Sequence, residues 1–300
     1  MNVTLDQWKA LISVVDSGGY EKAAEALNKS QSSVTYAVQK LQSQLGVKVF
    51  EVKGRKAVLT STGKFLYRRA RALLEEAAAT ELAAGRLSAG WEAEIGLAVE
   101  VAFPTWLLLQ CLERFGGESP HTRIEVIESV LGGTSEALLQ GQAALAVTGM
   151  VPQGFLGDFL MPIRFLPAAH PDHPLHKLGR AVTMQDLRAH RQLVIRESGL
   201  KRATKPRVEA AQRWTVSHMT TSIEAASKGY GYGWYPEYRI RDEIAAGTLK
   251  ALPLREGADS FAQLYLVFAD REAAGPGALR LAAIIREMAE AACVKERGRQ

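Results

Sequence analysis

Apolar side chains recur at helical spacing in three segments near the start of the chain. This periodicity predicts three short amphipathic helices, the first over residues 5–16. The breaker Ser17-Gly18-Gly19 follows the first helix, the turn Asn28-Lys29-Ser30 follows the second, and Gly46 ends the third. The apolar stripes are Leu5, Trp8, Leu11, Ile12 and Val15; Ala23, Ala24 and Leu27; and Val34, Val38, Leu41 and Leu45.

A β-hairpin and a long helix are expected next. Residues 47–60 place apolar positions on both sides of the turn Lys53-Gly54-Arg55, which predicts the hairpin. A helix from Thr62 to about Leu87 then carries an alanine-rich apolar stripe. Such a stripe must be buried, and its natural partner is the same helix of a second chain. The residues assigned to this dimer contact are Leu66, Ala70, Leu73, Leu74 and Ala77.

Strands and helices alternate from Ala93 onward, which predicts a parallel sheet with crossover helices. The expected strands are residues 94–99, 122–129, 144–147, 159–169, 192–196, 232–235 and 261–269. The expected helices are residues 104–115, 134–140, 222–228, 236–246 and 278–293.

Composition narrows the class of protein. The chain has 300 residues, of which 47% are hydrophobic and 23% charged, and this suits about two globular domains. Two cysteines, Cys111 and Cys293, are too few for a disulfide framework. Asp6 and Lys9 argue against a signal peptide, and no uncharged apolar stretch approaches the ~20 residues of a membrane helix. We therefore expect a cytoplasmic protein.

Positive charge is concentrated near the start of the chain. Residues 20–71 hold 11 basic and 3 acidic side chains, whereas residues 91–300 hold 24 of each. A basic module on a neutral body favours an anionic polymer as its partner, although a solvated basic face explains the charge alone equally well.

The second and third helices have the spacing of a helix-turn-helix, whose second helix lies in the DNA major groove. With the apolar stripe of residues 34–45 facing inward, short polar side chains face outward, and glutamine can pair with adenine. A polar three-helix subdomain without DNA is the alternative, which the hairpin and the charge disfavour. The candidate DNA-binding residues are Lys29, Ser30, Gln31, Ser32, Ser33, Thr35, Tyr36, Gln39, Lys40 and, on the hairpin tip, Arg55.

These residues resemble the signature of LysR-type transcriptional regulators over about the first 66 positions. Three positions depart from the family pattern: Lys29 replaces an apolar residue, Gly19 a frequent serine, and Ala144 a frequent aspartate. The matching segments are Ala23-Ala24, Leu27, Ser30-Gln31-Ser32-Ser33-Val34-Thr35, Leu41, Leu45-Gly46-Val47, Val49-Phe50-Glu51, Arg55 and Leu59-Thr60-x-x-Gly63.

The resemblance implies a non-enzymatic regulator without a cofactor. It implies an α+β winged helix-turn-helix over residues 1–60, a linker and dimerisation helix over 61–90, and an effector-binding domain over 91–300. That domain would have two α/β lobes, as in periplasmic binding proteins: lobe I over about 92–161 and 268–300, and lobe II over about 162–267. The implied partners are double-stranded DNA, a small-molecule effector and a second copy of the chain. Tetramers are common in the family, and RNA polymerase is a further candidate partner.

Ligands of such sheets lie at the carboxyl ends of strands, near helix N-termini. This rule selects as effector-binding residues Glu100, Phe103, Arg196, Ser198, Thr220 and Trp234. They offer charge, hydroxyls and aromatic faces, so we expect a small polar or aromatic metabolite, for example an organic acid whose carboxylate meets Arg196.

Other motifs are weak. His170, His173 and His176 have a ligand-like spacing, but prolines between them predict an irregular loop, and we expect no metal. The glycines at 229–233 follow a helix instead of opening one, so they do not form a nucleotide-binding loop. No nucleophile elbow, zinc-protease motif or Walker loop occurs. An enzyme and a constitutive architectural DNA-binding protein remain as alternatives; the second leaves the α/β body unexplained.

Overall fold

The computed structural model describes residues 2–53, 56–199, 208–256 and 260–297. The chain folds as two compact units, Met1–Ala89 and Gly90–Gln300, called unit 1 and unit 2 below. No helix within the described ranges is long and apolar enough to cross a membrane.

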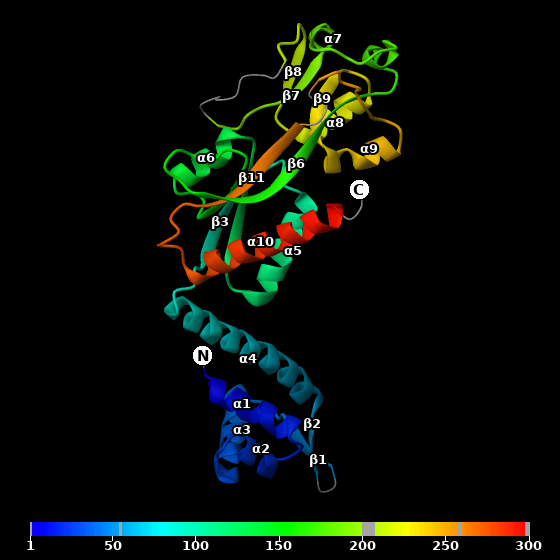
Figure 1. The fold of residues 1–300 in the computed structure, drawn as a ribbon. Coiled ribbons are helices and arrows are strands. Elements are labelled where there is room, and N and C mark those ends of the chain that lie inside the picture. The colour runs from blue at the N-terminus through cyan, green and yellow to red at the C-terminus, as the bar shows by residue number, and fades with distance from the viewer. Residues whose placement is uncertain (1, 54–55, 200–207, 257–259, 298–300) are drawn as a thin grey trace. The chain divides into compact units, whose positions relative to one another are not determined.

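Unit 1 is a three-helix body followed by a hairpin and a long helix (Figure 1). Its elements are α1 (Leu5–Asp16), α2 (Tyr20–Ala26), α3 (Gln31–Leu45), β1 (Phe50–Lys53), β2 (Lys56–Leu59) and α4 (Ser61–Ser88). Most of the predicted apolar stripe residues meet in the core, where Leu11, Val38 and Leu41 are fully buried. Leu45, predicted as the last inward residue of the third stripe, is instead 37% exposed in the final turn of α3. Asn28 adopts the left-handed conformation expected of the turn, with φ 51°.

The hairpin is shorter than predicted. Strand β1 begins at Phe50 and not at Val47. The N–H groups of Val49 and Phe50 donate to Oε1 of Gln42 on α3, at 2.7 and 3.3 Å. This side chain replaces a strand partner, and it fixes the entry to the hairpin against the three-helix body.

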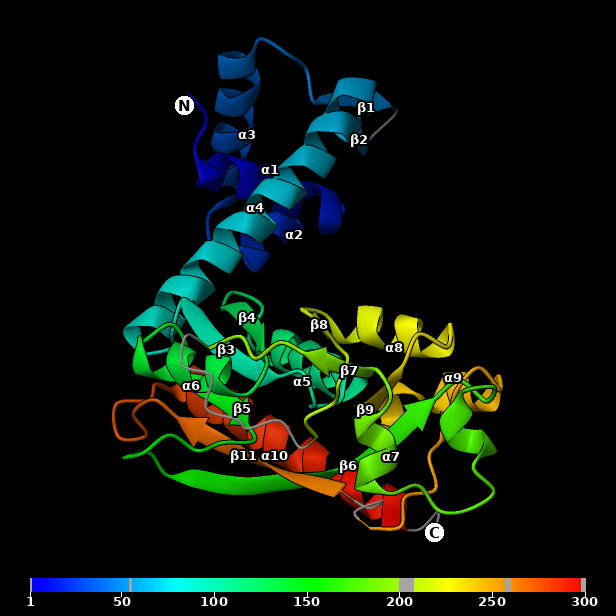
Figure 2. The same cartoon turned by 90° about the horizontal axis from the view of Figure 1, so that it is seen from above.

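Unit 2 is a two-lobed α/β unit built on one twisted sheet with the strand order β4-β3-β5-β11-β6-β9-β7-β8 (Figure 2). Strands β3, β4 and β5 are parallel in lobe I, and β7, β8 and β9 are parallel in lobe II. Two long antiparallel strands, β6 and β11, connect the lobes.

The elements of unit 2 follow one another in an alternating order. In lobe I they are β3 (Glu94–Glu100), α5 (Thr105–Glu118), β4 (Arg123–Ser129), α6 (Gly132–Leu139), β5 (Leu145–Thr148) and α10 (Pro276–Arg297). The connecting strands are β6 (Gly157–Ala169) and β11 (Ser260–Phe268). Lobe II contains a 3-10 turn (Pro174–Lys177), α7 (Met184–Arg188), β7 (Gln192–Ile195), β8 (Arg213–Val216), α8 (Met219–Ser227), β9 (Tyr232–Pro236), a 3-10 turn (Glu237–Arg239), α9 (Arg241–Ala245) and β10 (Lys250–Ala251).

Helix α10 closes the core of lobe I. It lies beside α5 on one face of the sheet (Figure 1), and Leu281, Ile284 and Ile285 are fully buried there. Ion pairs join the two helices at Arg280–Glu118, 2.6 Å, and Arg114–Glu287, 2.7 Å. The last helix of the chain therefore completes a core whose strands lie far earlier in the sequence.

Two sequence expectations fail in lobe II. The helix predicted over residues 236–246 is a 3-10 turn followed by α9, because Pro236 ends β9 and the fully buried Ile240 separates the two. Strand β8 is not predicted by the sequence analysis: its four residues Arg213–Val216 alternate polar and apolar, but the segment is short and mostly exposed.

Candidate functional site

Helix α3 presents a polar face to solvent. The opposite face holds the helix in unit 1 through the buried Val34, Val38 and Leu41. Tyr36 is 64% exposed, and Nζ of Lys40 lies 5.7 Å from the centre of its ring. The exposed polar residues of this face are Gln31, Ser32, Ser33, Tyr36, Gln39 and Lys40, and Thr35 is half-buried among them.

Several of the predicted contact residues make hydrogen bonds within the helix and its cap. Ser30 is the N-cap of α3, where its Oγ accepts from the N–H of Ser33 at 3.2 Å. The hydroxyls of Ser30 and Ser33 also lie 2.7 Å apart. Thr35 donates its hydroxyl to the carbonyl of Gln31 at 2.8 Å. The hydroxyl of Ser32 also lies 3.0 Å from that of Ser30. Gln31 and Tyr36 are therefore the side chains best placed for contacts outside the helix.

The flanking basic residues are only partly described. Nζ of Lys29 forms an exposed ion pair with Asp6 of α1 at 3.6 Å, so a departure from the family pattern serves as a contact between α1 and the turn. Arg55, predicted on the hairpin tip, lies outside the described residues.

The predicted dimer stripe of α4 divides into two parts. Ala70 is buried, and Leu66 packs on the cluster formed by Leu11, Leu41 and Val49, so both are covered within unit 1. Ala70 is therefore buried and Leu66 half-buried without a second chain, and the dimer contact stays a prediction. Leu73 is 39% exposed, Leu74 and Ala77 are half-buried, and Leu82 and Leu87 are exposed further along the helix.

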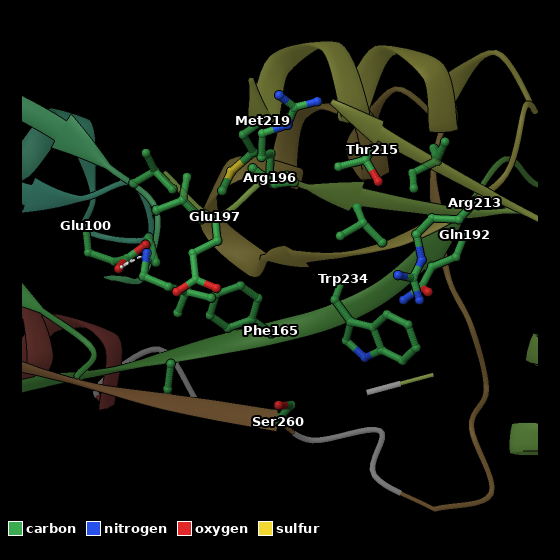
Figure 3. A pocket seen from close by; sticks show the side chains of 18 of the residues that line it. Glu100, Phe165, Gln192, Arg196, Glu197, Arg213, Thr215, Met219, Trp234 and Ser260 are labelled. Carbon is green, nitrogen blue, oxygen red and sulfur yellow. Dashed lines mark hydrogen bonds between the residues drawn. The ribbon is translucent and has the colours of Figure 1, made fainter. Parts of the chain in front are cut away.

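A cavity of about 480 Å³ lies between the two lobes of unit 2 (Figure 3). Its wall comes from the end of β3, the turn after β4, strands β7, β8 and β9, the start of α8, and the connecting strands β6 and β11. Three predicted residues, Glu100, Arg196 and Trp234, line it. Its other polar and aromatic lining residues include Phe165, Gln192, Glu197, Arg213, Thr215 and Ser260.

The other three predicted effector residues are outside this cavity wall. Phe103 is 2% exposed and belongs to the core of lobe I, because the chain turns inward after β3. Thr220 is exposed on α8, which begins at Met219, and Met219 lines the cavity in its place. Ser198 joins the lobes instead: its Oγ accepts from the N–H of Val130 at 2.6 Å, and its own N–H donates to the Val130 carbonyl at 3.1 Å.

Ser198 belongs to an interlobe clasp formed by residues 130–133 of lobe I and 197–199 of lobe II. The Glu197 carboxylate accepts from the N–H of Gly132 at 3.1 Å. A Cβ on Gly133 would lie 2.8 Å from Cβ of Ser198, which explains a glycine at this close approach. Leu131 has φ 52°, a backbone conformation that residues other than glycine rarely adopt. The clasp is thus a tight, strained contact at the mouth of the cavity.

Glu100 is a buried acid at the same place. It is 4% exposed, and its Oε2 accepts from the N–H of Leu131 at 2.8 Å. Burial raises the pKa of Glu100 to about 7; the Leu131 N–H opposes this shift, and the nearby charge of Glu197 adds to it. Two carboxylates from different lobes therefore meet successive N–H groups of one turn.

The histidine loop has a local explanation. Nδ1 of His173 accepts from the N–H of Leu175 at 3.3 Å and so caps a 3-10 turn. Burial, aided by the charges of neighbouring histidines, lowers the pKa of His173 to about 4. Within the described ranges, no three His, Cys, Asp or Glu side chains are grouped as metal ligands.

Two family descriptions match the chain. Residues 5–64 match the bacterial regulatory helix-turn-helix protein of the lysR family, and residues 88–290 match the LysR substrate binding domain. The sequence is 29% identical over 255 residues to YeeY of Escherichia coli K12, named an uncharacterized HTH-type transcriptional regulator; the match covers 83% of this chain and 82% of that protein. It is 26% identical over 270 residues to the regulator CrgA of Neisseria meningitidis, covering 86% and 88%.

Solved structures share the fold. The structure of CrgA, a LysR-type transcriptional regulator from Neisseria meningitidis, matches with TM-score 0.51 and 23% identity over 95% of this chain and 97% of that one. Full-length LysG from Corynebacterium glutamicum matches with TM-score 0.51 and 20% identity over 96% and 98%. The named relatives are transcriptional regulators, which sets aside the enzyme, and the substrate binding domain accounts for the α/β body that an architectural protein left unexplained.

Proposed function

Because the chain belongs to the LysR family of DNA-binding transcriptional regulators with a domain for small-molecule effectors, we propose that α3 reads its operator and that the interlobe cavity holds its effector. The exposed face of α3 carries the DNA part of this proposal. In it, Gln31, Ser32 and Tyr36 contact base edges, while Lys40, Lys29 and the undescribed Arg55 meet phosphates. Ser30, Ser33, Thr35 and Gln39 orient the helix and complete its polar face.

The experiment for DNA reading works without a known operator. The full-length protein is used to select binding sequences from a random duplex library, and the selection is repeated with Gln31→Ala and with Gln44→Ala. Gln44 is an exposed glutamine of the same helix and serves as the matched control. The proposal expects a changed consensus for Gln31→Ala only. An identical consensus from all three proteins would remove the assignment of this face.

The effector part of the proposal is carried by the cavity between the lobes. It has the size of a small-molecule site, and its wall combines aromatic faces at Phe165 and Trp234 with charged and polar groups. Both lobes contribute lining residues, so a bound molecule would change how the lobes are held together. Ligand-dependent DNA affinity of the full-length protein is the direct readout.

A homodimer is the proposed working unit. Leu73, Leu82 and Leu87 leave apolar surface exposed along α4, and the same helix of a second chain is the proposed cover. Two copies would present two α3 helices to a pseudo-palindromic site. Because it acts on bacterial DNA, the protein would work in the cytoplasm. The proposed dimer could also pair with a second dimer to form a tetramer, and it could contact RNA polymerase.

A further inference from the structure

The charged groups of the cavity wall are unevenly distributed. Among the described lining residues they are Glu100, Glu197, Arg196 and Arg213. Figure 3 shows the carboxyl groups of Glu100 and Glu197 at one end and Arg213 at the other, with Phe165 and Trp234 between them. Arg196, the cation expected to hold an organic acid, is exposed and extends away from Phe165 and Glu197.

The two carboxylates at the acidic end of the cavity lie close enough for the charge of Glu197 to affect Glu100. Leu131 and Gly132 donate successive N–H groups to Glu100 and Glu197, which brings the two carboxylates to one turn. Glu100 is buried, so its negative charge is poorly hydrated there, and Glu197 adds repulsion. A carboxylate accepts more than one hydrogen bond, so the buried carboxylate of Glu100 retains acceptor capacity for a ligand that brings a positive charge.

A second observation on the same wall also requires a donor. Gln192 is 5% exposed, and its Oε1 has no hydrogen-bond partner among the described residues. A buried amide oxygen without a donor is costly. Gln192 lies at the end of the cavity opposite to Glu100, beside Arg213 (Figure 3).

We propose that the effector is a small amine, whose protonated nitrogen binds the buried carboxylate of Glu100 and whose other end supplies an N–H or O–H donor to Oε1 of Gln192. The inference rests on the effector site proposed above. Phe165 and Trp234 suit the body of such a ligand, because aromatic faces attract cations as well as apolar groups. An acceptor beside the distal donor, as in a carboxamide, would in addition meet Arg213.

The test compares ligands that differ in charge and little else. Full-length protein is titrated by calorimetry with phenethylamine against phenylacetate, with putrescine against succinate, and with γ-aminobutyramide against butyramide. We expect the amines to bind and their partners without an amine to bind at least about tenfold more weakly, since a charge-assisted contact is lost. Binding by phenylacetate or succinate but by no amine would overturn the proposal, and so would the absence of binding by every amine.

Variants locate the binding. Glu100→Gln is expected to weaken the binding amine by about tenfold or more and Gln192→Leu by about threefold or more, whereas Glu125→Gln, an exposed acid on β4, leaves it unchanged. Amine binding should also strengthen between about pH 6 and 8 in wild type as Glu100 ionises, and this trend should vanish in Glu100→Gln. Unchanged affinity in both cavity variants would overturn the assignment.

DNA affinity is measured in parallel to separate the two proposals. If an acid binds, depends on cavity residues and changes DNA affinity, the amine class is wrong and the proposed effector function stands. If an amine binds at Glu100 without changing DNA affinity, the amine site stands and the proposed regulatory role of the cavity is wrong.

Discussion

The carboxylate of Glu92 accepts a hydrogen bond from the backbone N–H of Gly277 at 2.9 Å, across 185 residues of sequence. It also accepts from Ala278 at 3.1 Å, so one side chain before β3 caps the first turn of α10. A Cβ on Gly277 would lie 2.7 Å from this carboxylate, so a larger residue there would displace the Glu92 side chain. The contact links the start and the end of unit 2.

Removing this cap is expected to destabilise unit 2. Glu92→Ala leaves two N–H groups of α10 without their charged acceptor, which costs about 1–2 kcal/mol. Urea unfolding followed by circular dichroism measures the loss, and Glu94→Ala, an exposed acid on β3, is the control. Equal midpoints for both variants would show that water replaces the Glu92 carboxylate without cost.

Two adjacent glycines predict opposite effects on unit 1. Gly19 is the N-cap of α2 without a side-chain cap, and its extended backbone accepts any residue. Gly19→Ser should therefore add about 0.5–1 kcal/mol of stability. Gly18 has φ 74°, so Gly18→Ser should cost about 1 kcal/mol. Thermal unfolding of both variants gives the sign directly, and stabilisation by Gly18→Ser would contradict the backbone argument.

The face of α3 predicts two kinds of DNA defect. Gln31→Ala should cost ~1–3 kcal/mol on the selected operator and relax specificity at one base pair. Lys40→Ala should weaken all sequences alike and reduce the salt slope by about one. Fluorescence anisotropy at several salt concentrations separates the two, with Gln44→Ala as the control. A salt slope that Lys40→Ala leaves unchanged would place Lys40 away from phosphate.

The dimer prediction concerns the exposed part of the apolar stripe of α4. Leu73→Asp combined with Leu82→Asp should give monomers that still fold, because both side chains are exposed. Leu66→Asp should instead destabilise unit 1, where that leucine packs on the core. Sedimentation velocity gives the assembly state and circular dichroism the fold. A dimer that survives the double change would show that the exposed part of α4 is not the main interface.

Glu100 predicts a pH dependence of stability. Its pKa is raised to about 7 in the folded chain, so it stabilises the fold when protonated, and this contribution is lost as the pH rises from about 4.5 through 7. Glu100→Gln lacks this loss. Relative to wild type, the variant should gain on the order of 2–3 kcal/mol between about pH 5 and 8. Urea unfolding at the two pH values tests it, with Glu125→Gln expected to show no such trend.

Sequence reasoning reached the helices of unit 1 because their apolar stripes are read directly as buried faces, as at Val34 and Val38. It reached Glu100 and Arg196 because strand ends mark the cavity edge. It missed Gln192 and Arg213, which are the first residues of β7 and β8. The rule selects residues at the carboxyl ends of strands, so it does not select these two positions. Phe103 and Thr220 failed because the rule fixes a place in the chain and not the direction of a side chain.

Leu66 and Ala70 show a related limit of reasoning from sequence. Periodicity shows that a helix face is covered but not by which neighbour, and here α1 and the core of unit 1 cover it. The clasp could not be foreseen either, since the partner of the Ser198 hydroxyl is the backbone N–H of Val130, and a backbone group carries no sequence signal.

The position of α10 at the end of unit 2 sets an order of events during translation. The core of lobe I stays open until Leu281, Ile284 and Ile285 have left the ribosome, whereas unit 1 has all its residues by Ala89. At about 5–20 residues per second, the helix-turn-helix can fold on the order of ten seconds or more before lobe I is complete. Each newly made chain therefore passes through an interval in which its DNA-binding unit exists without a finished sensor.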